Sequence, residues 1–141
     1  MSNEQILFDE QTLFSGVCDC IRQTLEKDLP EIHATDRLIA DLGIDSLDFL
    51  DLIFRLEQQF NVSVNPRDME RRTQEILGDE PMQVDGCYTA RAVEEFRKAM
   101  PEVPAEELFP NMPANRLPAC FRVKTFMNLV AFAQAGEGGE K

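Results

Sequence analysis

The chain has 141 residues, of which 26 are acidic and 14 basic, so its formal net charge is −12. This length favours a single domain with room for one hydrophobic core. A strongly acidic surface repels nucleic acid and anionic membranes, and it favours positively charged protein surfaces as partners. We therefore expect partners of the last kind and no binding to nucleic acid.

The sequence shows no sign of a membrane span or a secretion signal. No stretch approaches the ~20 consecutive apolar residues of a spanning helix, and the start, MSNEQILFDE, lacks a basic flank and an apolar core. The four cysteines contain no CxxC pair, and we interpret them as reduced thiols, with a metal or redox role as the alternative. The sequence predicts a soluble, cytoplasmic monomer.

Apolar periodicity predicts two helices in the N-terminal half. The first follows Asp9, a residue type that caps helices, and Leu29-Pro30 closes it. A long linker from Glu31 to Asp45 is held down by spaced apolar residues. The second helix begins at Asp45 or Ser46 and ends near Phe60. The apolar stripes of these helices are Phe14, Val17, Cys18, Ile21 and Leu25 in the first and Phe49, Leu52, Ile53, Leu56 and Phe60 in the second.

The second half of the chain is rich in proline and gives weaker signals. Residues 62–64 alternate like a short strand, but no partner strand is evident nearby. Prolines between residues 101 and 118 allow at most a short helical turn at 105–109. Helices are predicted at 67–77, 89–100 and from Val123 through Val130, and residues 136–141, which contain no apolar side chain, are predicted to be a disordered tail.

The run from Asp41 to Asp48 places a serine hydroxyl where the linker turns into the second helix. Ser46 lies in no GxSxG motif, and the single histidine, His33, has no recognisable partner motif, so a serine hydrolase is disfavoured. A helix N-terminus favours an attached phosphate through its free N–H groups and its dipole. The alternative is that Asp45 or Ser46 is only an N-cap. A cation site among the nearby aspartates is disfavoured because the EF-hand order is absent.

The wider pattern around this serine resembles the acyl carrier proteins. The resemblance is carried by Asp41-Leu42-Gly43-Ile44-Asp45-Ser46-Leu47-Asp48, then Leu50 and Asp51, and then a helix that ends in Leu56-Glu57-Gln58-Gln59-Phe60-Asn61-Val62. It covers about residues 7–64 and resumes at about 121–132. It implies an all-α fold, a four-helix bundle with a long loop between its first two helices. An extra, partly helical insertion at about 66–120 departs from the family pattern.

The resemblance also implies a function. Ser46 is the expected attachment point of 4′-phosphopantetheine, which a separate phosphopantetheinyl transferase adds. The chain is then no enzyme: it carries acyl intermediates as thioesters in fatty acid, polyketide or specialised lipid synthesis. Expected partners are a ketosynthase, an acyltransferase or other acyl-processing enzymes with basic docking patches. The residues expected to meet them are Asp45, Leu47, Asp48, Leu50, Asp51, Phe54 and Glu57. The alternative is an unmodified interaction module with the carrier fold.

Further expectations concern the cargo, the domain organisation and the insertion. The apolar stripes of the bundle, among them Phe49, Ile53 and Val130, are expected to part around an acyl chain. We expect residues 1–135 to form a single carrier domain. The insertion at 66–120 is either a surface elaboration or an element that covers the bundle or docks a partner. Its basic residues are expected to pair with the acidic N-terminal half, and they are Arg71, Arg72, Arg91, Arg97 and Lys98.

Overall fold

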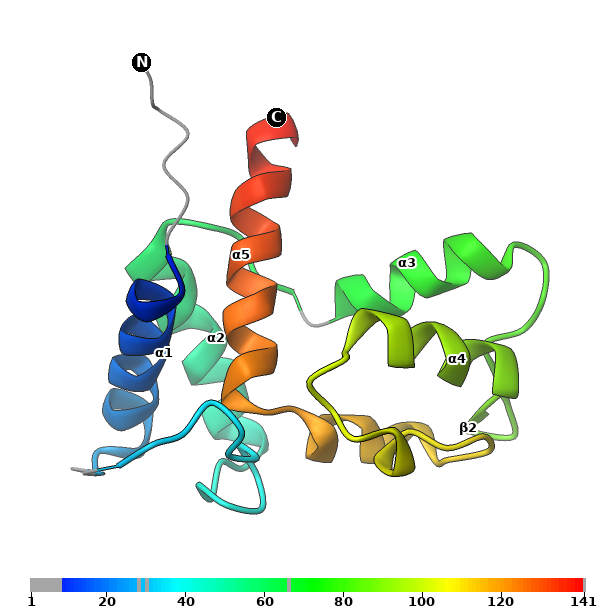
Figure 1. Ribbon diagram of the computed structural model, residues 1–141, viewed down its shortest axis with the longest axis horizontal. Coiled ribbons are helices and arrows are strands. Elements are labelled where there is room, and N and C mark those ends of the chain that lie inside the picture. Colours follow the sequence, from blue (N-terminus) through cyan, green and yellow to red (C-terminus); the bar gives the residue numbers. More distant parts are fainter. Residues whose placement is uncertain (1–8, 28, 30, 66, 141) are drawn as a thin grey trace.

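The computed structural model describes residues 9–27, 29, 31–65 and 67–140 (Figure 1). Its fold class is all-α, as predicted, with one two-stranded sheet in addition. The elements are α1 (Glu10–Leu25), α2 (Ser46–Phe60), α3 (Arg67–Leu77), β1 (Gln83–Val84), β2 (Cys87–Tyr88), α4 (Ala90–Ala99), the 3₁₀ helices η1 (Ala105–Glu107) and η2 (Ala114–Cys120), and α5 (Val123–Glu140).

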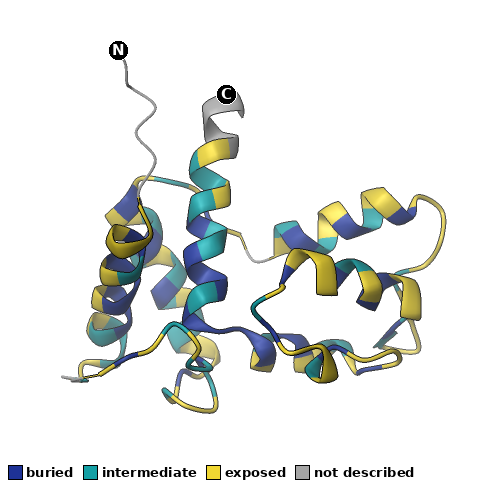
Figure 2. Ribbon diagram, viewed as in Figure 1, coloured by how far each residue is buried: buried dark blue, intermediate teal, exposed yellow. Residues whose placement is uncertain are grey.

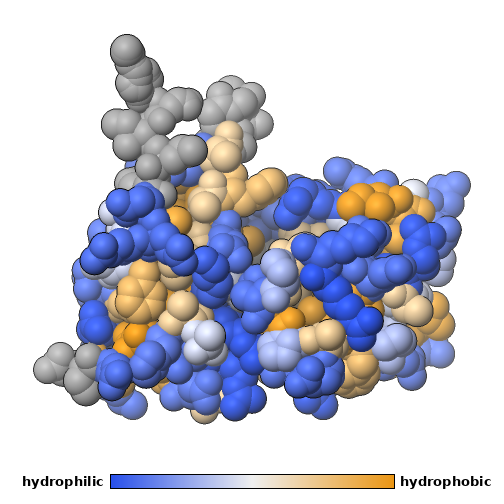
Figure 3. Space-filling model, viewed as in Figure 1, coloured by the Kyte–Doolittle hydropathy of each residue, from blue (hydrophilic) through white to orange (hydrophobic). Residues whose placement is uncertain are grey.

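Helices α1, α2 and α5 form one bundle, in which α1 packs against both α2 and α5 (Figure 1). The predicted stripes face its core: Val17 and Ile21 of α1, Leu52 of α2 and Phe126 of α5 are fully buried. Figure 2 shows the same division, with buried positions on the facing sides of the helices and exposed positions outside. Hydrophilic residues accordingly cover most of the face drawn in Figure 3, with smaller apolar patches between them. The amphipathic periodicity of the sequence therefore fixes which side of each bundle helix is buried.

Helix α1 ends earlier than the sequence indicates. The prediction used Leu29-Pro30 as the stop, but α1 ends at Leu25 because Glu26 adopts a left-handed conformation with φ of 55°. The N–H of Glu26 donates to the carbonyl of Arg22 and closes the last turn. Pro30 lies outside the described residues. Helix α2 has the predicted bounds, with Asp45 as N-cap and Asn61 as a left-handed C-cap.

Residues 67–120 form a second body beside the bundle, which we call the inserted lobe. Helix α3 packs on α4, and the hairpin and both 3₁₀ helices complete the lobe (Figure 1). The hairpin was not predicted. Its two-residue turn, Asp85-Gly86, has positive φ at both positions, 55° and 80°, which matches the Asp-Gly turn preferred in such hairpins. The inserted lobe and the bundle share one continuous hydrophobic core among the described residues.

The prediction for the proline-rich stretch was wrong in one place. It allowed only a turn at 105–109, where η1 is found, but η2 spans Ala114–Cys120 and contains Pro118. Proline is compatible with a short 3₁₀ segment because its fixed φ is close to the helical value. Leu117 and Cys120 of η2 are buried and anchor the segment to the core.

The basic residues of the inserted lobe have their partners within the lobe or, for Arg72, on α5. Arg91 pairs with Glu80 at 2.9 Å, Lys98 with Glu95 at 3.3 Å, and Arg71 with Asp68. The guanidinium of Arg97 donates to the carbonyl oxygens of Leu108 and Ala105, and that of Arg72 stacks on Phe132. Within the described ranges, none of these five side chains pairs with an acidic group of residues 9–65, so the expected pairing with the acidic half is wrong.

The segment leading into α5 joins the inserted lobe to the bundle. Arg122, with only 8% of its side chain exposed, forms two hydrogen bonds of 2.8 Å to the carboxylate of Glu107 and a third to the carbonyl of Cys120. The hydrogen bonds from Arg122 hold the pKa of Glu107 below its ordinary value. A buried, bidentate pair of this kind fixes η1 against the start of α5.

Two findings concern the ends of the molecule and the membrane. In the part of the chain that the structure describes, no helix is both long and apolar enough to cross a membrane. Helix α5 continues to Glu140. The disordered tail at 136–141 and the single domain over 1–135 stay predictions.

We expect Arg122→Leu to destabilise the protein by about 2–3 kcal/mol, because it leaves a partly buried carboxylate without its partner. Lys124→Leu, which removes the exposed pair with Glu10, is the matched control and is expected to cost less than ~1 kcal/mol. Urea denaturation measures both. Equal losses in the two variants would contradict the assigned role of Arg122.

The same pair makes stability depend on pH. Because the folded-state pKa of Glu107 is lowered, its contribution is complete above the ordinary glutamate pKa of ~4.3 and is lost as pH falls below that value through the lowered pKa. The difference in unfolding free energy between the wild type and Arg122→Leu is therefore expected to shrink in this acidic window. Denaturation at neutral pH and below pH 4 tests it, and a difference that grows on acidification would refute it.

Candidate functional site

The loop before α2 is ordered by its own hydrogen bonds and by buried side chains. Ile32, Leu38 and Ile44 are buried, as the spacing of apolar residues in the linker predicts. The carboxylate of Asp41 accepts from the backbone N–H of Arg37 at 2.8 Å, and this bond is the main cause of its lowered pKa. Gly43 lies at the turn into the helix and has a φ of 82°, a backbone conformation that residues with a side chain rarely adopt. The loop therefore holds the start of α2 in a defined position.

Asp45 and Asp48 form a capping box at the start of α2. The Asp45 carboxylate accepts from the N–H of Asp48 at 2.8 Å, and the Asp48 carboxylate accepts from the N–H of Asp45 at 3.1 Å. This arrangement satisfies two of the backbone donors that a helix start leaves free. The cap interpretation is therefore confirmed for Asp45, and the next residue, Ser46, becomes the first helical residue.

Ser46 is exposed and lies at the N-terminus of a helix fixed in this way. In the described part of the chain its hydroxyl has no hydrogen-bond partner, so no side chain is placed to deprotonate it. His33 is engaged elsewhere, by Glu31 at 3.1 Å and Asp36. A serine without a base is a poor nucleophile, and any acylation or phosphorylation here requires a second protein to supply the chemistry.

The position fits a phosphodiester that is attached covalently. The N–H groups of Ser46 and Leu47 have no protein acceptor within the described ranges, and the helix dipole is positive here. However, the carboxylates of Asp45 and Asp48 lie beside the same hydroxyl in sequence and in the cap. Their negative charge disfavours a free phosphate ion, so electrostatic attraction alone does not make this a site for one.

Three large apolar side chains lie on the exposed side of α2. Leu47, Leu50 and Phe54 are 76%, 67% and 57% exposed, and their spacing of three and four residues places them on one face of the helix. We call these three residues the apolar ridge. Large apolar side chains exposed together are typical of protein-protein contact sites. The ridge starts one residue after Ser46, so a partner that binds it reaches the serine.

The acidic residues predicted to meet partners all have intramolecular bonds. Asp45 and Asp48 bind one another's backbone, and Asp51 accepts from Arg55 at 2.7 Å. That bond is the main cause of the lowered pKa of Asp51. Glu57 accepts from the N–H of Val64 at 3.0 Å and ties the end of α2 to the following segment. Each of these carboxylates therefore has a structural role within the protein.

The sequence interpretation placed Arg55 on the solvent-facing side of α2 but did not anticipate its pairing with Asp51. Its guanidinium bonds Asp51 and, at 3.2 Å, the amide oxygen of Gln23 on α1. The i,i+4 spacing of Asp51 and Arg55 is the signal that predicts such a pair. The exposed face of α2 therefore combines an apolar ridge with one internally neutralised carboxylate.

The cysteines and potential metal ligands show no further site. Cys18 and Cys20 are both buried, and burial raises the pKa of each to about 11, so both are protonated near neutral pH. Across the described ranges, no group of three or more His, Cys, Asp or Glu side chains is close enough together to hold a metal ion.

Comparisons with known proteins agree on one class. A family model described as "Phosphopantetheine attachment site" matches residues 15–75, which include Ser46. The "Acyl carrier protein AcpXL" of Rhizobium etli is 41% identical over 63 residues, 45% of this chain and 65% of its own length. The chain thus spans slightly less than two thirds of that relative. No solved structure matches the chain significantly.

Two other relatives are covered more completely. The "Acyl carrier protein" of Exiguobacterium sp. is 34% identical over 71 residues, 50% of this chain and 81% of its own length. The "Acyl carrier protein" of Thermotoga maritima is 38% identical over 61 residues, 43% of this chain and 75% of its own length. The matched lengths amount to half of this chain or less, and the family model ends within α3.

We expect Asp45→Ala to lower the free energy of unfolding by about 1 kcal/mol, because it removes the side-chain acceptor for the N–H of Asp48. Asp45→Asn is the matched control, since asparagine caps helices about as well, and its loss is expected to be a few tenths of a kcal/mol. Urea denaturation of the unmodified protein distinguishes them. Equal destabilisation by both substitutions would show that charge, not capping, is what Asp45 provides.

Proposed function

Because the chain belongs to the acyl carrier protein family, we propose that Ser46 is the residue that bears its 4′-phosphopantetheine. Family membership implies this covalent group, and the family's members are carriers rather than catalysts. The observation that carries the assignment is the exposed hydroxyl of Ser46, the first residue of a capped helix inside the matched segment. The absence of a base beside Ser46 in the described residues agrees with modification by a separate transferase.

The carrier holds acyl groups as thioesters on the thiol end of the arm and presents them to successive enzymes. The phosphodiester at Ser46 fixes one end of the arm to a rigid helix start, and the rest of the arm provides reach. We assign the pathway to fatty acid, polyketide or specialised lipid synthesis. The names of the relatives support the carrier class and do not separate these pathways.

Partner enzymes bind the exposed face of α2. The apolar ridge of Leu47, Leu50 and Phe54 supplies the contact area, and the acidic residues around it attract basic patches. A phosphopantetheinyl transferase and acyl-processing enzymes such as a ketosynthase or an acyltransferase are the expected partners. A small, charge-steered interface releases the carrier quickly, as a shuttle requires. A cytoplasmic location and a monomeric state stay predictions from the sequence.

Modification is tested first. Co-expression with a phosphopantetheinyl transferase is expected to add one phosphopantetheine to the wild type and none to Ser46→Ala, as measured by intact mass. Ser63→Ala, which changes another exposed serine, is the matched control and is expected to be modified like the wild type. An unmodified wild type with several transferases, together with partner binding that is indifferent to Ser46→Ala, would instead indicate an unmodified interaction module.

The docking surface is tested through the same reaction. Leu50→Glu places a charge in the middle of the apolar ridge, and we expect it to reduce kcat/KM for the transferase at least tenfold, which corresponds to ~1.4 kcal/mol. Val84→Glu changes an apolar side chain that is also half exposed, 53%, but lies on the inserted lobe. It is expected to leave kcat/KM unchanged. Similar losses in both variants would place docking outside the ridge.

A further inference from the structure

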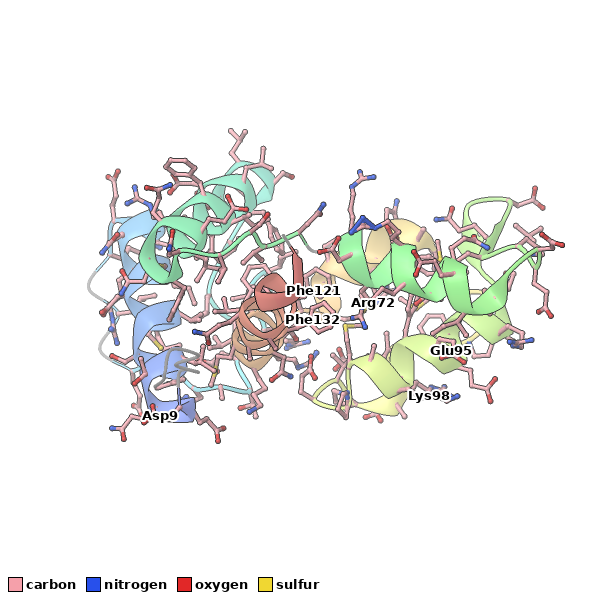
Figure 4. All side chains as sticks on the ribbon, turned by 90° about the horizontal axis from the view of Figure 1, so that it is seen from above. Asp9, Arg72, Glu95, Lys98, Phe121 and Phe132 are labelled. Carbon is pink, nitrogen blue, oxygen red and sulfur yellow. The ribbon has the colours of Figure 1, made fainter. Side chains whose placement is uncertain are left out.

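A groove separates α5 from the inserted lobe. Its walls come from α3, from the end of α4 with the residues that follow it, and from α5, and its volume is about 400 Å³. This volume lies in the range of ligand pockets, roughly 300–1,000 Å³. Its apolar walls are formed by Met69, Met100, Phe121, Leu129 and Phe132. We call this the interlobe groove; Figure 4 looks toward it from above, with Phe121, Phe132 and Arg72 gathered between α5 and α3.

Most polar side chains of the interlobe groove already have partners within the protein. The carboxylate of Glu102 accepts from the hydroxyl of Thr125 at 2.7 Å and from the amide of Asn128 at 3.2 Å. Lys98 pairs with Glu95. The guanidinium of Arg72 lies 4.2 Å from the ring centroid of Phe132 and bridges the groove from α3 to α5. What the groove offers an occupant is therefore apolar surface.

One end of the groove lies next to the segment that carries Ser46. The carbonyl of Phe121 accepts from the N–H of Leu38 at 3.1 Å, and the carbonyl of Leu38 accepts from the N–H of Ile44 at 3.0 Å, two residues before Ser46. The ring of Phe121 also contacts Phe49, in the first turn of α2, with centroids 6.0 Å apart. Phe121, which lines one end of the groove, therefore lies beside both the loop that precedes Ser46 and the first turn of α2.

The inner space of the bundle at this level is filled with aromatic rings. Phe49 packs edge-on against Phe126 with centroids 5.7 Å apart, and Phe121 lies 6.1 Å from Phe126. Opening the bundle for a chain means separating these contacts, whereas the interlobe groove has a space of about 400 Å³ without such a separation, although Met69 and Met100 in its walls are only 6% and 2% exposed. Met69 and Met100 in its walls have flexible side chains that adapt to an occupant.

We propose that the interlobe groove, and not the core of the bundle, holds the cargo of this carrier, and that this cargo is a long aliphatic acyl chain. The inference rests on the proposed attachment of the arm at Ser46. Residues 98–102 of the groove lie outside the segment 15–75 that matches the family, so the compartment depends on the inserted lobe. The lobe thereby gains a role as the outer wall of a cargo site. A chain in the groove is shielded from water, which is the source of its binding free energy.

Methyl NMR on the full chain tests this, with ¹³C-labelled methionine and the protein loaded with butyryl or palmitoyl groups. Met69 and Met100 report on the groove, and Met127, buried in the bundle at 1% exposure, reports on the core. We expect the palmitoyl form to shift the methyl resonances of Met69 and Met100 relative to the butyryl form and to leave that of Met127 in place. A shift confined to Met127, or no shift at any of the three, overturns the proposal.

A groove-filling variant provides the second measurement. Ala99→Trp places a large side chain in the wall of the groove, and Ala90→Trp, at the opposite end of α4 and also exposed, is the matched control. We expect the palmitoyl-dependent shifts at Met69 and Met100 to be lost in Ala99→Trp and retained in Ala90→Trp; retention in both contradicts the proposal. A protein without phosphopantetheine by intact mass overturns the proposed function and this inference together. A loaded protein with unchanged Met69 and Met100 overturns this inference alone.

Discussion

The short segment between η2 and α5 connects the three parts of the molecule on which function depends. The carbonyl of Phe121 binds the loop before α2, and the N–H of Val123 donates to the carbonyl of Asp36 at 3.0 Å. Between them, Arg122 binds Glu107 of the inserted lobe from a nearly buried position. Residues 121–123 thus bind the loop that precedes Ser46 on one side and the inserted lobe on the other. This junction therefore connects the loop that leads to Ser46 with Phe121, which lines the interlobe groove, and with the inserted lobe.

Local patterns were sufficient to predict the helices. The i, i+3, i+4 recurrence at Val17 and Ile21, or at Phe126 and Val130, depends only on residues close in sequence, and it gave the correct buried faces. The hairpin was missed because its strands are only two residues long and show no alternation, although Asp85-Gly86 carried a turn signal. The junction at Phe121 was out of reach because it pairs backbone groups more than 80 positions apart.

The candidate site likewise has features that the sequence predicts and features that it does not predict. The position of Ser46 and the cap at Asp45 were predictable because both depend on the few residues around a helix start. The fate of the acidic residues was harder to predict. A solvent-facing carboxylate has the same sequence pattern whether it faces a partner or an internal group, and only the structure shows Glu57 bonded to the N–H of Val64. Because Arg55 pairs with Asp51, it offsets part of the negative charge on this face of α2, and the net charge of −12 for the whole chain does not show this local effect.

The two surfaces assigned here share no residue. The apolar ridge belongs to α2, whereas the walls of the interlobe groove come from α3, α4, the residues that follow it and α5. A partner that contacts only Leu47, Leu50 and Phe54 therefore touches none of the residues that line the groove. The link between them is the contact of Phe49 with Phe121, because one ring lies in the first turn of the docking helix and the other at the end of the groove. This contact, together with the backbone bonds beside it, provides a direct route for coupling between partner binding and release of the chain.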